Sequence, residues 1–144
     1  MIKTPEFWAS RGPVAIALSP LSLLWAAGSY LQRFMSKPGK VALPVICVGN
    51  LTAGGTGKTP LTAFIYDHLT KLGYRPAILM RGYGGSAEQP VWVDHSQNQA
   101  NLCGDEAVML AESRDVMVAR DRLTGAAIIA ASGSYDVILM DDGL

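Results

Sequence analysis

The sequence contains little cysteine and has no excess of charge of either sign. Its two cysteines, Cys47 and Cys103, lack the spacing of metal ligands, so a disulfide scaffold and a cysteine zinc site are both disfavoured. Twelve basic and twelve acidic side chains give a formal net charge of zero. Because nucleic-acid phosphates are held mainly by surplus cations, this balance argues against a nucleic-acid partner. A reducing, cytosolic compartment fits these features best.

The charge is unevenly distributed along the chain. Residues 1–40 carry five basic side chains and one acidic side chain, whereas residues 41–144 carry seven basic and eleven acidic ones. The two parts therefore have net charges of +4 and −4, and we expect them to face different surroundings. With 49% hydrophobic residues, the 144-residue chain is long enough for one domain with its own core.

The N-terminal part contains twenty consecutive uncharged residues, 12–31. This length could span a bilayer, but Pro13, Pro20 and Gly28 interrupt it. We therefore predict that residues 1–40 form an apolar helical segment that lies in the membrane interface. Aromatic side chains would lie at headgroup depth, and the basic residues Arg11, Arg33, Lys37 and Lys40 would face anionic lipid. A buried core helix, a true span and a signal peptide remain alternatives.

Residues 41–144 alternate between predicted strands and helices. Apolar, β-rich runs predict strands at 41–48, 77–80, 116–119 and 137–140, with a hairpin or edge strand at 91–93. Helices are predicted at 59–72, 105–113 and 123–131, and the first has apolar residues at 61, 64, 65, 69 and 72. Continuous apolar strands separated by helices indicate an α/β fold, a mainly parallel sheet with helices on both faces.

A glycine-rich loop follows the first predicted strand. Residues 49–60 read Gly-Asn-Leu-Thr-Ala-Gly-Gly-Thr-Gly-Lys-Thr-Pro, which is typical of the P-loop of nucleoside triphosphatases (NTPases). The glycines allow a tight nest of inward-pointing backbone N–H groups, and the helix that follows adds its positive end. The strict pattern has glycine where this chain has Thr52. A glycine-rich turn with a surface lysine is the alternative.

These features predict a nucleoside triphosphate site in a P-loop NTPase-like domain over residues 41–144. Lys58 would reach the β- and γ-phosphates, and the Thr59 hydroxyl would bind Mg²⁺. The predicted nucleotide-binding residues are Thr52, Ala53, Gly54, Gly55, Thr56, Gly57, Lys58 and Thr59.

A second element supports the same site. Residues 136–142 form an apolar strand that ends in two carboxylates, Asp141 and Asp142. This is the form of a Walker B strand, whose carboxylate holds Mg²⁺ directly or through water. A strand that ends in a simple Asp-Asp-Gly turn is the alternative.

Five short motifs, in this order, resemble the tetraacyldisaccharide 4′-kinase family, the lipid A 4′-kinases. They are residues 49–60, Arg-Gly-Tyr-Gly-Gly at 81–85, Gly-Asp-Glu at 104–106, Asp-Arg at 121–122 and Asp-Asp-Gly-Leu at 141–144. The resemblance implies transfer of the ATP γ-phosphoryl group to the 4′-hydroxyl of a tetraacyl glucosamine disaccharide 1-phosphate in lipid A biosynthesis. It also implies a peripheral enzyme on the cytoplasmic face of the bacterial inner membrane.

The resemblance also implies roles for individual residues. Asp105 would be the catalytic base, and Arg122 and Lys58 would stabilise phosphate charge. Glu106 is a further expected Mg²⁺ ligand. Arg81 and Tyr83 follow a strand at the carboxyl edge of the sheet, where contact with the acceptor's phosphate or sugar is expected. The alternatives are a glycine turn, a helix cap and a solvated surface arginine.

The predicted sheet and the family both continue beyond the last motif, so we expect the chain to be a fragment that is inactive alone. The alternative function is a membrane-associated regulatory P-loop ATPase. The signature lysine of those proteins would occupy the position of Ala53, and its absence disfavours that function.

Overall fold

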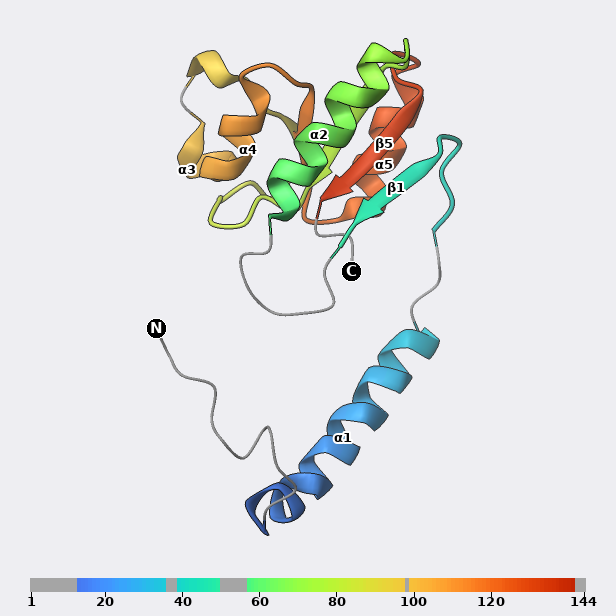
Figure 1. Ribbon diagram of the computed structural model, residues 1–144, viewed down its shortest axis with the longest axis vertical. Coiled ribbons are helices and arrows are strands. Elements are labelled where there is room, and N and C mark those ends of the chain that lie inside the picture. The colour runs from blue at the N-terminus through green and yellow to red at the C-terminus, as the bar shows by residue number, and fades with distance from the viewer. Residues whose placement is uncertain (1–12, 36–38, 50–56, 98, 142–144) are drawn as a thin grey trace. The chain divides into compact units, whose positions relative to one another are not determined.

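The computed structural model describes residues 13–35, 39–49, 57–97 and 99–141 (Figure 1). The chain divides into two units, residues 1–39 and residues 40–144. In the first unit, helix α1 runs over Pro13–Met35 with Pro20 inside it. Leu23, Leu24 and Trp25 on this helix are each more than 70% exposed. None of the helices in the described residues is both long and apolar enough to cross a membrane.

The second unit is built on a five-stranded sheet. Its strands are β1 (Val45–Val48), β2 (Pro76–Met80), β3 (Val91–Trp92), β4 (Val116–Val118) and β5 (Val137–Asp141). Their order in the sheet is β1-β5-β2-β4-β3. All neighbouring strands are parallel except the edge pair β3 and β4. The predicted mainly parallel sheet is therefore confirmed. β1 starts at Val45 rather than at residue 41; Pro44, just before it, has no backbone N–H to donate to a ladder.

Helices cover both faces of this sheet. Helix α2 (Lys58–Lys71) and helix α4 (Asp105–Ala111) pack on the face of Ile78 and Met80. Helix α5 (Arg122–Ala131) packs on the other face, against Ala77 and Leu79. Short helical turns, η2 (His95–Gln97) and α3 (Ala100–Cys103), precede α4. The side chains of β2 thus alternate between two cores, as expected for a strand buried on both faces.

The buried face of α2 differs from the predicted one. Leu61, Phe64 and Leu72 are 50%, 67% and 60% exposed, whereas Thr62 and Tyr66 are buried. The Thr62 hydroxyl donates to the backbone carbonyl of Lys58 over 3.1 Å, and the Tyr66 hydroxyl accepts from a backbone N–H over 3.2 Å. Because both polar groups have partners, they can be buried at little cost. The prediction of the buried face from apolar residues is therefore wrong at positions 61, 64 and 72, whereas Ile65 and Leu69 pack against the core as expected.

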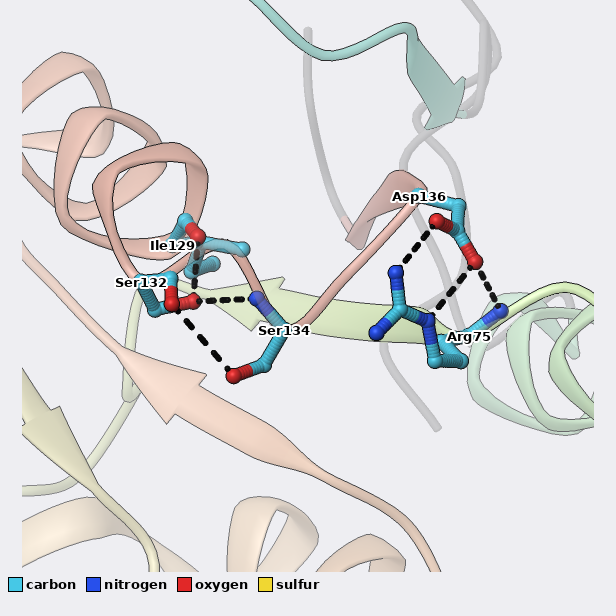
Figure 2. Close-up of polar contacts among 5 residues, drawn as sticks. All are labelled: Arg75, Ile129, Ser132, Ser134 and Asp136. Carbon is cyan, nitrogen blue, oxygen red and sulfur yellow. Dashed lines mark hydrogen bonds and ion pairs between the residues drawn. The ribbon is translucent and has the colours of Figure 1, made fainter.

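An ion pair connects the starts of β2 and β5 at the amino edge of the sheet. The Arg75 guanidinium donates to both carboxylate oxygens of Asp136, over 2.8 and 3.0 Å (Figure 2). The backbone N–H of Arg75 donates to the same carboxylate, and that of Asp136 donates back to the Arg75 carbonyl. These bonds lower the pKa of Asp136 to about 2. The nearby end of α5 is closed by Ser132, whose hydroxyl donates to the Ile129 carbonyl (Figure 2).

Candidate active site

The site is built at the carboxyl edge of the sheet. In the parallel register of β1 and β5, Val48 lies opposite Asp141. β1 leads toward residues 50–56, which lie outside the described residues, and α2 begins at Lys58. Asp141 is 4% exposed. The predicted Walker B strand therefore lies directly beside the predicted P-loop strand.

The first turn of α2 presents a positive helix end to this edge. Gly57 precedes the helix with φ 74°, a left-handed conformation that favours glycine. The backbone N–H of Leu61 donates to the Gly57 carbonyl over 3.1 Å and closes the first turn. The first N–H groups of an α-helix have no acceptor within the helix, and a proline such as Pro60, which carries no N–H group, is well tolerated in the first turn. Such an end stabilises anions.

A cavity of about 690 Å³ opens at this helix end. It is lined by residues from the start of α2, the ends of β2 and β5, the loop after β2, the end of α3 and the first turn of α4. Seven of the predicted site side chains line it: Lys58, Thr59, Arg81, Tyr83, Asp105, Glu106 and Asp141. Residues separated by more than 80 positions in the sequence thus surround one space.

Two glycine-containing segments, the loop after β2 and the start of α4, form another part of the cavity lining. Tyr83 is 87% exposed and lies between Gly82 and Gly84, whose φ values are 74° and 81°. Asp105 begins α4 directly after Gly104, which has φ 89°. Both carboxylates of the predicted Asp105–Glu106 pair are exposed within the first turn of α4, where the helix end favours negative charge.

Arg122 is not among the residues that line the cavity. It is the first residue of α5, after Asp121, whose carboxylate accepts from the backbone N–H of Leu123 and from the Thr124 hydroxyl. These bonds lower the pKa of Asp121. The Arg122 Nε atom is buried and makes no hydrogen bond within the described residues. Its predicted role toward phosphate remains a prediction.

Several predicted residues lie outside the described part of the chain: Thr52, Ala53, Gly54, Gly55, Thr56 and Asp142. Among the described residues, no group of three or more His, Cys, Asp or Glu side chains gathers as a metal site. Of the predicted Mg²⁺ ligands, Thr59, Glu106 and Asp141 line the one cavity.

Cys103 also lines the cavity and was not predicted as a site residue. It is fully buried, and burial raises the pKa of its thiol. Cys103 directly precedes the Gly-Asp-Glu motif in the sequence, and this position could have indicated that it lies near the site.

Comparison with known proteins gives the family. The family model of tetraacyldisaccharide-1-P 4′-kinase matches residues 14–144. The tetraacyldisaccharide 4′-kinases of Rhodopseudomonas palustris (strain BisA53) and Methylobacterium sp. (strain 4-46) are each 46% identical, over 143 and 146 residues. Each alignment covers 99% of this chain but only 41% and 43% of the relative.

A solved structure agrees with this result. The crystal structure of the "apo" form of LpxK from Aquifex aeolicus in complex with ATP superposes with a TM-score of 0.71 at 29% identity. The match covers 90% of this chain and 44% of that one. The chain thus spans about two fifths of the length of the relatives it matches. On the match over residues 14–144, the chain belongs to the tetraacyldisaccharide 4′-kinase family.

Proposed function

We propose that these residues form the nucleotide-binding part of a lipid A 4′-kinase. Such an enzyme transfers the γ-phosphoryl group of ATP to the 4′-hydroxyl of a tetraacyl glucosamine disaccharide 1-phosphate. The observation that carries the proposal is the cavity at the carboxyl edge of the sheet, which predicted nucleotide-binding and acceptor-binding residues line together. Lys58, Thr59 and Asp141 line its nucleotide side, and Arg81, Tyr83 and Asp105 line its acceptor side.

On the nucleotide side, backbone N–H groups of residues 52–59 would surround the β- and γ-phosphates of ATP. The Lys58 ammonium would neutralise part of their charge, at the positive end of α2. Among these groups, the N–H groups in the first turn of α2 are held by the helix, and amide groups held in this way stabilise charge without reorganisation during the reaction.

The residues at this edge fit Mg²⁺. The Thr59 hydroxyl and the Asp141 carboxylate are hard oxygen donors that line the same cavity, and Glu106 adds a third. Asp141 is nearly buried, which suits a carboxylate that balances a cation. Asp142 would complete the set. When bound, Mg²⁺ neutralises charge on the phosphate oxygens.

On the acceptor side, Asp105 would orient the 4′-hydroxyl. The hydroxyl oxygen forms the new bond to the γ-phosphorus, the bond from that phosphorus to the β-γ bridging oxygen breaks, and the hydroxyl proton passes to the Asp105 carboxylate. Arg81 and Tyr83 would bind the sugar or the 1-phosphate. Arg122 would stabilise charge on the transferred group.

The acceptor carries acyl chains, so the enzyme must work at a membrane surface. The exposed apolar side chains of α1 support peripheral attachment through residues 1–40 at the cytoplasmic face of the bacterial inner membrane. ATP is supplied on that face.

A phosphoryl-transfer assay on the full-length protein tests this proposal. The protein is incubated in detergent with γ-labelled ATP, Mg²⁺ and a tetraacyl disaccharide 1-phosphate, and label is expected in the lipid. Lys58→Ala should abolish transfer, while Lys71→Ala, in the last turn of the same helix, should not. Hydrolysis stimulated only by a protein partner, with no labelled lipid, would overturn the proposal in favour of the regulatory ATPase.

A further inference from the structure

The loop that carries Arg81 and Tyr83 touches the turn that carries Asp105 through main-chain atoms at three glycines. We propose that Gly82, Gly85 and Gly104, the three-glycine contact, are positioning residues that hold the acceptor-side groups in one fixed arrangement. The inference rests on the proposed function, because it assigns a purpose to the geometry of that site.

The contact is too close for any side chain. A Cβ atom on Gly85 would lie 2.3 Å from the Leu102 carbonyl oxygen and 2.8 Å from the carbonyl carbon of Cys103. A Cβ on Gly104 would lie 2.4 Å from the Tyr83 carbonyl oxygen. Ordinary van der Waals contact begins at 3.4 Å. Each substitution must therefore displace backbone, which cannot move away as a flexible side chain can.

Gly82 anchors the same contact to the sheet. Its Cβ would lie 2.3 Å from Cγ1 of Val118, the last residue of β4, and 3.2 Å from the Cys103 carbonyl oxygen. Val118 and Cys103 are both fully buried, or nearly so. The loop after β2 is thus held between β4 and the end of α3.

Backbone hydrogen bonds continue the contact on both sides. The N–H groups of Ser86 and Ala87 donate to the carbonyls of Asn101 and Leu102 over 3.1 and 2.9 Å. The Gly104 carbonyl accepts from the N–H of Val108 over 3.2 Å, in the first turn of α4. A displacement at Gly85 or Gly104 is therefore transmitted to Asp105, the first residue of that helix.

None of these contacts involves the nucleotide side of the cavity. Lys58 and Thr59 belong to α2 and Asp141 to β5, and the three atoms nearest to each Cβ position described above belong to neither element. The arrangement predicts that disturbing the contact reduces phosphoryl transfer while leaving nucleotide affinity unchanged. A merely structural role would affect both.

The loop offers a matched pair of glycines. Gly85 has no left-handed φ, so Gly85→Ala introduces the clash without backbone strain. Gly84 has φ 81° and nothing within 4 Å of its Cβ position, so Gly84→Ala introduces strain without a clash. Comparing the two variants separates the effect of a clash with the backbone of Leu102 and Cys103 from the effect of replacing a glycine in this loop.

The test measures lipid phosphorylation, affinity for ATP with Mg²⁺, and amide hydrogen exchange in the full-length protein. We expect Gly85→Ala to lower kcat on the order of 100-fold, as a misplacement of about 1 Å does, with nucleotide affinity unchanged within about twofold. Exchange should accelerate at Ser86, Ala87 and Val108 and not in α2. Gly84→Ala should lower kcat by much less than Gly85→Ala.

The outcomes are distinguishable. If the wild type transfers no phosphoryl group, the proposed function fails, and the exchange pattern still tests the contact. If the wild type transfers and Gly85→Ala transfers equally well, or loses nucleotide affinity in parallel, the inference is overturned. Should Gly85→Ala not fold, Ser86→Ala removes an exposed hydroxyl that donates to the Asn101 carbonyl over 3.1 Å. It should then lower kcat about threefold, and an unchanged kcat would overturn the inference.

Discussion

Asp141 lies opposite Val48 in the ladder between β5 and β1, so a carboxylate ends the strand beside the one that leads into the glycine-rich loop. The carboxylate is nearly buried and lines the same cavity as Lys58 and Thr59. This placement depends on the sheet order, in which β5 is the neighbour of β1 although the two strands are far apart in the sequence.

Asp141→Asn should therefore weaken nucleotide binding only when Mg²⁺ is present. The amide keeps the shape of the side chain but removes the charge that would balance the cation, and we expect a loss of at least about tenfold in affinity. Calorimetric titration of ATP with and without Mg²⁺ measures the difference. Asp136→Asn, just before the other end of β5, serves as control. If both variants lost the same affinity for ATP in the presence of Mg²⁺, the prediction that Asp141 binds Mg²⁺ would be contradicted.

Gly125→Ala should destabilise the α/β unit by about 1–3 kcal/mol through overpacking. Its Cβ would lie 2.7 Å from the Cβ of Ala119 and 2.8 Å from a methyl group of Leu79, so α5 would have to move away from the sheet. This cost exceeds the gain of at most about 1 kcal/mol in helix propensity. Urea unfolding measures the change. Gly28→Ala, at a helical position with nothing within 4 Å, should not lower stability.

The sheet could be predicted because its signals are local. Residues 76–80 are all buried, and the continuous apolar run at 77–80 predicts a strand covered on both faces. The predicted Walker B strand is confirmed as the neighbour of β1. Element boundaries were less accurate: β1 is half the predicted length, and α4 ends at Ala111 rather than at residue 113.

The buried face of α2 and the three-glycine contact could not be predicted from the sequence. Thr62 and Tyr66 enter the core only because each finds a hydrogen-bond partner, and the partner of Tyr66 is 49 residues away. Gly85 and Leu102 meet because the loop after β2 lies against the short helix α3. Such contacts depend on how distant segments come together in the fold, and the local spacing of apolar residues does not predict them.

Tyr66→Phe should lower stability by about 0.5–1.5 kcal/mol, because the Asp115 N–H loses the hydroxyl oxygen to which it donates. The ring itself, which lies 6.0 Å below the Arg114 guanidinium, is kept. The urea midpoint measures the loss. Tyr74→Phe, at a half-exposed position, is the matched control. Equal midpoints for the two variants would show that the hydrogen bond contributes nothing.

The Arg75–Asp136 pair predicts a specific dependence of stability on pH. The folded-state pKa of Asp136 is about 2, below the ordinary carboxyl value of 3.8. The contribution of the Asp136 carboxylate to folding stability is therefore complete at pH values well above its ordinary pKa of 3.8 and is lost as the pH falls toward 2. Melting temperatures of the wild type and Asp136→Asn should differ by a constant amount above about pH 5 and converge near about pH 2. A difference that widens on acidification would contradict this prediction.

Vesicle binding should need both the cations and the apolar side chains of the first unit. Residues 1–40 carry a net charge of +4, and each cation near an anionic surface contributes about 1 kcal/mol. Added salt should therefore weaken sedimentation of the full-length protein with anionic vesicles, because it screens these attractions. Replacing Arg33, Lys37 and Lys40 with Gln should remove most of this salt dependence.

Trp25→Ala tests the apolar component separately. Trp25 is 79% exposed on α1, and an indole at headgroup depth favours the interface. We expect this variant to bind more weakly at every salt concentration while the slope against salt stays unchanged, because no charge is altered. Trp92→Ala, on β3 of the second unit, is the control for loss of an exposed indole. If Trp92→Ala weakens sedimentation as much as Trp25→Ala does, residues 1–40 are not the attachment site.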